Sequence, residues 1–79
     1  MPRVRKSEIP EYARLLGVRI REIRERNNIS IEEVAYRAEL DAQNLRKYEL
    51  GKQEMKVSML KRIAEALNLT VSELVVDIK

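Results

Sequence analysis

Residues 41–52 read DAQNLRKYELGK, the pattern of one short helix with a marked start and a marked end. Asp41 can cap the start, because a short carboxylate accepts the free backbone N–H groups of the first turn. Gly51 can end the helix, because glycine enters the left-handed conformation without a Cβ penalty. Leu45 and Tyr48 are three residues apart and share one face, which we expect to pack inward.

Four further helices are predicted around this stretch by apolar residues at helical spacing. They cover about 10–27, 30–38, 57–67 and 70–75, and no stretch alternates as a strand does. The fold class is therefore predicted to be all-α, a compact five-helix domain. The residues expected in the core are Leu16, Ile20, Ile23, Val34, Ala35, Leu45, Tyr48, Leu60, Ile63, Ala64 and Leu67.

The ends of these helices are also marked in the sequence. Pro10 suits the first turn of the first helix, where its missing N–H costs nothing. Residues 27–28 are Asn-Asn, a C-terminal stop, while Gly17 weakens the same helix locally. Residues 30–33 and 70–73 each predict a capping box, in which hydroxyl and carboxylate satisfy each other's backbone donors.

The chain of 79 residues suits a single domain. We expect a mobile basic arm over residues 1–9, the helical domain over residues 10–75 and a short tail over residues 76–79. Residues 1–28 hold eight Arg and Lys against four Glu, so the net charge of this segment is +4, whereas the net charge of the whole chain is only +3. A local excess of cations fits a nucleic-acid partner on one face, and also an ordinary domain.

Several functional classes are disfavoured by composition. The chain has no His and no Cys, which removes the commonest general base and metal ligands, so we expect no metal site and no cofactor. The remaining polar residue types form no plausible catalytic constellation, so an enzyme is not expected. No apolar run approaches a bilayer span and none follows the basic start, so we expect a cytoplasmic protein without a membrane partner.

The ordered set of segments from about residue 15 to residue 74 resembles the lambda-repressor/Cro-like helix-turn-helix domain of bacterial and phage regulators. The matching stretches are residues 20–24 (IREIR), 30–35 (SIEEVA), 45, 48, 49–52 (ELGK), 63–67 (IAEAL) and 70–74 (TVSEL). Four residues depart from the family pattern. Glu39 replaces a glycine in the turn, Ile31 replaces a glutamine, Leu50 replaces a polar residue, and Lys56 replaces a small cap.

The resemblance implies that residues 42–50 form a recognition helix in the major groove of DNA. Gln43 and Asn44 carry amides that can pair with adenine, and Ala42 can meet a thymine methyl group. Arg46 and Lys47 can reach guanine or phosphates. Each also has a plainer interpretation, as a polar surface residue, a helix former or a solvated charge.

The resemblance also implies contacts with the DNA backbone and one structural ion pair. Ser30, at the start of the second helix, and Gly51 with Lys52, just past the third, are expected to meet phosphates. The alternative for Lys52 is an ordinary loop lysine. Arg24 and Glu49 are expected to form an ion pair that ties the first helix to the end of the third.

Members of the family commonly bind near-palindromic sites as dimers, so we expect a homodimer. The apolar residues available for a self-complementary patch are Val75, Val76 and Ile78 with Met55, Val57 or Leu50. Alternatively, the C-terminal residues fold back over their own core. The leading hypothesis is a sequence-specific regulator of transcription. The alternative is a protein-interaction module, such as an antitoxin that neutralises a toxin.

Overall fold

The computed structural model describes residues 9–76. Ile78 and all of the expected N-terminal arm except residue 9 therefore lie outside the described residues. Five helices follow one another in this range: α1 (Glu11–Arg26), α2 (Ile31–Ala38), α3 (Ala42–Glu49), α4 (Val57–Ala66) and α5 (Val71–Val75). No strand occurs within residues 9–76. The predicted all-α, five-helix fold is confirmed.

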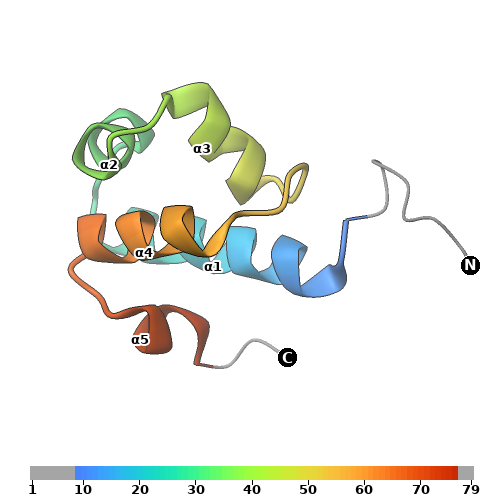
Figure 1. Ribbon diagram of the computed structural model, residues 1–79. Helices are drawn as coiled ribbons and strands as arrows, with labels where there is room; N and C mark the ends of the chain where they lie inside the picture. Colours follow the sequence, from blue (N-terminus) through green and yellow to red (C-terminus); the bar gives the residue numbers. More distant parts are fainter. Residues whose placement is uncertain (1–8, 77–79) are drawn as a thin grey trace, which may run out of the picture.

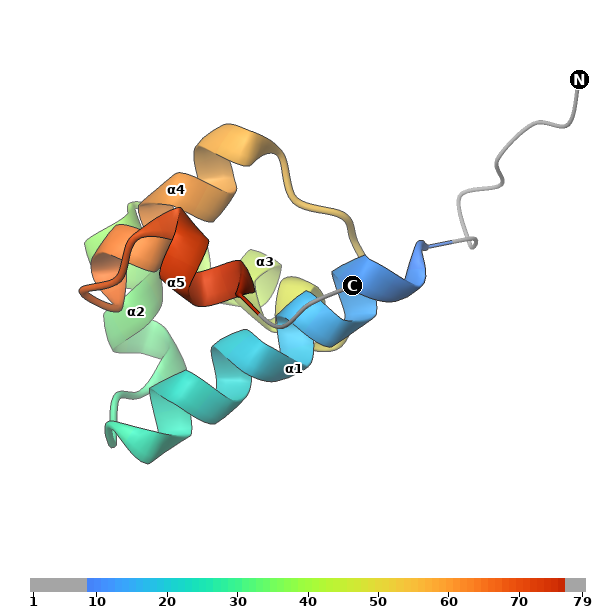
Figure 2. The ribbon, with the colours of Figure 1, turned by 90° about the horizontal axis from the view of Figure 1, so that it is seen from below.

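The helices lie in three levels (Figure 1). The α2 and α3 helices are at the top of this view, α1 and α4 cross the middle, and α5 lies below. Seen from below, α5 is in front and α3 is on the far side (Figure 2). The principal packing is α1 against α3, and α2 against both α3 and α4. None of the helices within residues 9–76 has the length and apolar character needed to cross a membrane.

The helices α1 to α4 all end on a left-handed residue, at Asn28, Glu39, Gly51 and Asn68 in turn. At the end of α3, the Gly51 N–H donates to the Tyr48 carbonyl at 3.1 Å and the next N–H donates to the Lys47 carbonyl at 2.9 Å. This pair of hydrogen bonds is the Schellman motif, which satisfies the last carbonyls of a helix. Gly51 therefore ends α3 as the sequence predicts.

Two predicted helix starts differ in detail from the structure. Pro10 has φ −58° and ψ 147°, so it is the cap residue and α1 begins one residue later. Ser30 accepts from the Glu33 N–H at 3.0 Å, but the Glu33 carboxylate pairs with Arg37 one turn on, at 2.9 Å. The second half of that capping box is therefore missing. The box at Thr70 is complete.

The buried core follows the predicted periodicity with one exception and several additions. Leu60 is only partly buried. Ile31, at the position of an expected polar contact, is a core residue. The buried apolar residues are Ala13, Leu16, Ile20, Ile23, Ile31, Val34, Ala35, Ala38, Leu45, Tyr48, Ile63, Ala64, Ala66, Leu67 and Leu74.

Three arginines reach from one helix to the C-terminal carbonyls of another. Arg62 donates to the carbonyls of Ala38 and Glu39, at 2.9 and 2.6 Å. Arg19 and Arg37 bind carbonyls in the last turns of α5 and α4. A cation is favourable at a helix C-terminus, where the dipole is negative. Arg62 therefore supports the α2–α3 turn, in which Glu39 stands where the family has glycine.

Candidate nucleic-acid interface

The inward side of α3 is fixed against α1 by a close approach of the two backbones. Leu45 and Tyr48 are buried at 0% and 6% exposure. Gly17 of α1 lies against the last turn of α3, where a Cβ atom would come within 2.8 Å of the Glu49 carbonyl oxygen and nearer still to that of Tyr48. Glycine is therefore required at position 17 by packing, although the sequence alone marks it only as a weak point.

The second glycine of the chain lies at the same junction. A Cβ atom on Gly51 would come within 2.9 Å of Cγ and 3.1 Å of Cα of Arg14 in α1. Gly51 also has φ 70°, a backbone conformation that residues other than Gly, Asn and Asp rarely adopt. Both glycines thus set the distance between α1 and the end of α3.

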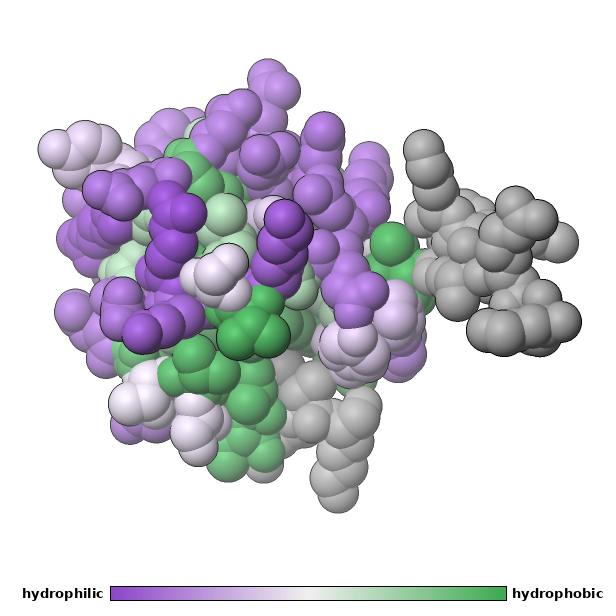
Figure 3. All heavy atoms as spheres, in the orientation of Figure 1, coloured by the Kyte–Doolittle hydropathy of each residue, from purple (hydrophilic) through white to green (hydrophobic). Residues whose placement is uncertain are grey.

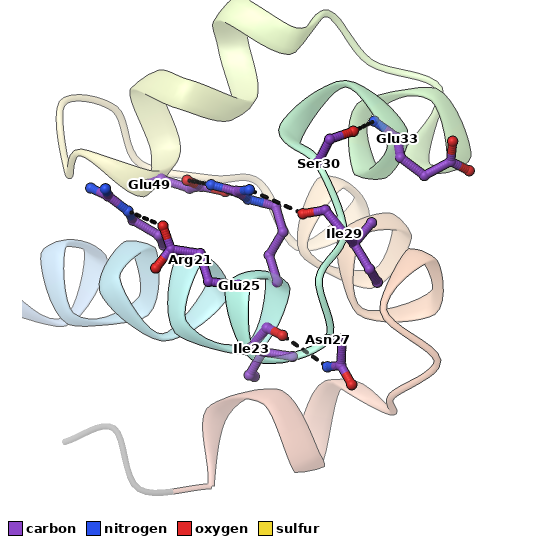
Figure 4. A network of polar contacts seen from close by, with 9 residues as sticks. Arg21, Ile23, Glu25, Asn27, Ile29, Ser30, Glu33 and Glu49 are labelled. Carbon is purple, nitrogen blue, oxygen red and sulfur yellow. Dashed lines mark hydrogen bonds and ion pairs between the residues drawn. The ribbon is translucent and has the colours of Figure 1, made fainter.

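Arg24 and Glu49 form a bidentate ion pair between α1 and α3. The Arg24 Nε donates to Glu49 Oε2 at 2.8 Å and Nη2 donates to Oε1 at 3.1 Å. The third nitrogen, Nη1, donates to the Ile29 carbonyl at 3.1 Å. Figure 4 shows Glu49 and Ile29 among the polar contacts that join α1, the α1–α2 turn and α3. The side chains are only 13% and 4% exposed, and the hydrogen bond to Glu49 raises the pKa of Arg24.

The outward side of α3 has a different character. Gln43, Arg46 and Lys47 are exposed, and their side chains make no hydrogen bond or ion pair with any other residue in the range 9–76. Asn44 is half-buried, and Ala42 packs partly against the core. The five base-reading candidates are therefore on one helix, but only three of them are exposed to solvent.

The outward residues border an open hollow of about 500 Å³. It is lined by Gln43, Arg46, Lys47, Leu50, Lys52 and Gln53. Sequence reasoning placed Leu50 in a self-association patch and did not single out Gln53. The spacing could have placed Leu50 here, because it lies seven residues after Gln43 and so on the same face of the helix.

The three phosphate candidates are placed less uniformly. Ser30 is exposed at the N-terminus of α2, and Lys52 is exposed beside the hollow. Gly51 is engaged in ending α3, because its N–H already donates to the Tyr48 carbonyl. The Gly51 amide is therefore not a free donor, and the role that the structure gives this residue is conformational.

A further contact holds the loop after α3. The Tyr12 hydroxyl of α1 donates to the Glu54 carboxylate, which raises the pKa of Tyr12. This contact lies next to Lys52 and Gln53 in the chain, so it limits where the end of the hollow can move. The two partners are 42 residues apart, and no local sequence rule relates them.

A family model described as a helix-turn-helix domain matches residues 15–75. The chain belongs to this family. The expected resemblance to lambda-repressor/Cro-like regulators is confirmed, and membership supports a role in DNA-binding transcriptional regulation. No curated protein sequence matches the chain.

Solved structures of the same fold include two bacterial regulators. The clp gene regulator ClgR from Corynebacterium glutamicum has 22% identity and a TM-score of 0.80, over 87% of this chain and 73% of its own. The restriction-modification controller protein C.AhdI from Aeromonas hydrophila has 26% identity and a TM-score of 0.75, over 81% and 96%. A chain of the SinR protein/SinI protein complex has 24% identity and a TM-score of 0.72, over 78% of this chain and 61% of its own.

Proposed function

We propose that this chain binds double-stranded DNA in a sequence-specific way through α3 and so regulates transcription in the cytoplasm. The proposal rests on the contrast within α3. One side is buried and paired, while the side chains of Gln43, Arg46 and Lys47 are exposed and make no hydrogen bond or ion pair in the range 9–76. A carboxamide matches the major-groove edge of adenine, and a guanidinium matches that of guanine. ClgR is a gene regulator and C.AhdI is a controller protein, which supports this role.

Ser30, at the start of α2, and Lys52, just past the end of α3, are assigned to the DNA backbone. The N-terminus of α2 carries unsatisfied N–H groups and the positive end of the helix dipole, both suited to a phosphate. The Lys52 ammonium supplies a point charge just past the C-terminal end of α3. Backbone contacts of this kind fix the register of the helix, and base contacts then specify the sequence.

Random-site selection on double-stranded DNA tests the proposal directly. We expect one selected sequence and binding that weakens steeply as salt rises, because cations on the protein displace counterions from phosphates. Gln43→Ala should relax the preference at one base pair by about 1–3 kcal/mol without lowering the melting temperature. Glu22→Ala, exposed on α1, is the matched control and should leave the preference intact. Unchanged base preference in Gln43→Ala would refute its assignment.

We further propose that two copies bind a near-palindromic site. Figure 3 shows hydrophobic residues gathered over α5 and the adjoining part of α4, away from the hydrophilic surface over α2 and α3. Val57 and Val76 are 79% and 63% exposed, and Val75 is partly buried. This face can be shared by two copies while both recognition helices remain free, with half-sites about one helical turn apart.

Sedimentation of the wild type and of Val76→Asp tests the dimer. The wild type should sediment as a dimer at micromolar concentration, and the variant as a monomer with an unchanged circular-dichroism spectrum. The variant should still bind a single half-site but should lose the gain in affinity from the second. A wild type that remains monomeric at high concentration and on the palindromic site would exclude this arrangement.

A protein partner is the second candidate function, and the similarity to the SinR–SinI complex supports it. In this case the apolar α4–α5 face would hold a different protein, as an antitoxin holds a toxin. Affinity purification from the source cells distinguishes the two. A stoichiometric partner protein, with no DNA selected at low salt, would favour the interaction module over the regulator.

A further inference from the structure

Leu50 is an apolar residue on a surface that is otherwise polar and cationic. It is the C-cap residue of α3 and is 49% exposed. It lines the hollow of about 500 Å³ beside the exposed cations, and it also lines a smaller hollow of about 90 Å³ that adjoins the Arg24–Glu49 pair. Arg46 is the other residue that borders both hollows. Leu50 therefore lies within the interface assigned to DNA, and neither hollow is lined by the exposed Val57 or Val76.

The position of Leu50 along α3 matches that of the base-reading candidates. Gln43 and Leu50 are seven residues apart, so they lie on one stripe of the helix with Arg46 and Lys47 between them. A rise of 1.5 Å per residue separates them by about 10 Å along the axis. Leu50 and Gln43 are therefore too far apart to meet the same base pair, since neighbouring nucleotides of a strand are 3.4 Å apart.

The chemistry of the major groove offers one apolar group to such a side chain. Phosphates and most base edges present only charges, donors or acceptors, whereas thymine presents a C5-methyl group. We propose that Leu50 reads a thymine methyl group, at a different base pair from the one that Gln43 contacts. This inference rests on the proposed function, because it requires α3 to lie in the major groove.

Replacement of single thymines by uracil in the selected site tests the contact, since uracil lacks only the methyl group. For the wild type, uracil at one position should weaken binding by about fourfold, the factor expected for one buried methyl-sized group. For Leu50→Ala, uracil at that position should make no difference, because the partner of the methyl is gone. Leu50→Met keeps an apolar side chain and should retain most of the penalty.

Val18→Ala is the matched control, because Val18 is an apolar residue of α1 with 40% exposure that lines neither hollow. It should show the wild-type penalty at the same thymine. Melting curves check that each variant is folded, and the wild-type uracil scan serves as the test if Leu50→Ala is not.

The possible outcomes separate this inference from the function on which it rests. If a sequence is selected but no uracil substitution weakens the wild type, the thymine contact is wrong and the regulator proposal stands. The inference is also overturned if uracil weakens binding of the wild type and of Leu50→Ala by the same factor. A third contradicting result is a loss of affinity in Leu50→Ala that is the same on thymine and uracil DNA while the wild type is insensitive to uracil, as expected for a sugar contact. If no DNA sequence is selected, the proposed function fails, and this inference with it.

Discussion

The two sides of α3 differ in what they have as partners. The side that faces α1 carries Leu45, Tyr48 and Glu49, which are all buried, and Glu49 is held by two hydrogen bonds from Arg24. The side that faces solvent carries Gln43, Arg46 and Lys47, whose side chains make no hydrogen bond or ion pair with any residue in the range 9–76. One helix of eight residues thus has two kinds of side. We call the side whose side chains pack and pair within the protein the occupied side, and the side whose side chains have no such partner the unoccupied side.

This difference shows how a small domain can separate stability from recognition. The helical period places residues 45, 48 and 49 on one side and residues 43, 46, 47 and 50 on the other. The occupied side fixes the orientation of the helix, so its unoccupied side is presented at a defined angle. Substitutions on the first side should therefore change stability, and substitutions on the second should change binding.

Arg24→Ala should give the largest loss of stability. Its removal leaves the Glu49 carboxylate buried at 4% exposure without its partner, which costs about 3–5 kcal/mol of unfolding free energy. Urea denaturation followed by circular dichroism measures the loss. Arg21→Ala removes the exposed pair with Glu25, with both side chains 55% exposed, and should cost under about 0.5 kcal/mol.

A double substitution sharpens this prediction. Arg24→Met combined with Glu49→Leu removes both charges, so it should recover much of the stability lost in Arg24→Ala. At a temperature where all variants are folded, base preference should persist in Arg24→Ala. Equal urea midpoints for Arg24→Ala and the wild type would show that the pair does not hold α3.

Gly17→Ala should have the next largest effect. The added Cβ atom would meet the backbone carbonyls of Tyr48 and Glu49, which can move only if α3 moves away from α1. Overpacking of this kind costs about 2–3 kcal/mol. Ser58→Ala, at an exposed position in α4, is the control and should stay near the wild type in thermal unfolding. A neutral result for Gly17→Ala would mean that α1 and α3 do not approach so closely.

The helices and their ends could be predicted from the sequence because the rules involved are local. Apolar spacing and cap residues such as Asp41 and Thr70 act within one turn of the chain, and the structure retains them. The half-formed box at Ser30 shows the limit of such rules. Glu33 has a competing partner in Arg37 on the same helix, and the sequence does not say which bond forms.

The parts that could not be predicted depend on residues far apart in the chain. Glycine is required at position 17 because a Cβ atom there would meet the carbonyl oxygen of Tyr48. The Glu39 carbonyl accepts a hydrogen bond from Arg62, 23 residues later. Leu50 was assigned by its apolar character to a self-association patch, although its spacing from Gln43 puts it in the hollow. The site assignments from Gln43 to Lys52 remain predictions until DNA is tested.

Gly51→Ala should have a smaller effect than Gly17→Ala. Its left-handed backbone, with φ 70°, costs a residue with a Cβ atom about 1–2 kcal/mol. Gly51→Asn should cost less, because Asn28 and Asn68 hold the same conformation at the ends of α1 and α4. Thermal unfolding of both variants provides the comparison. If alanine and asparagine were equally destabilising, crowding by Arg14 rather than backbone strain would be the cause.

Substitution of the unoccupied side should have the smallest effect on stability. Arg46→Gln and Lys47→Gln remove exposed charges that make no hydrogen bond or ion pair in the range 9–76, so unfolding free energies should change by less than about 0.5 kcal/mol. Their effect should appear in DNA binding instead. If either cation contacts a phosphate, the slope of log affinity against log salt should fall by about 1 in that variant. If it contacts guanine, base preference should change at one position. A variant that loses stability but keeps both slope and preference would place that residue on the structural side of α3.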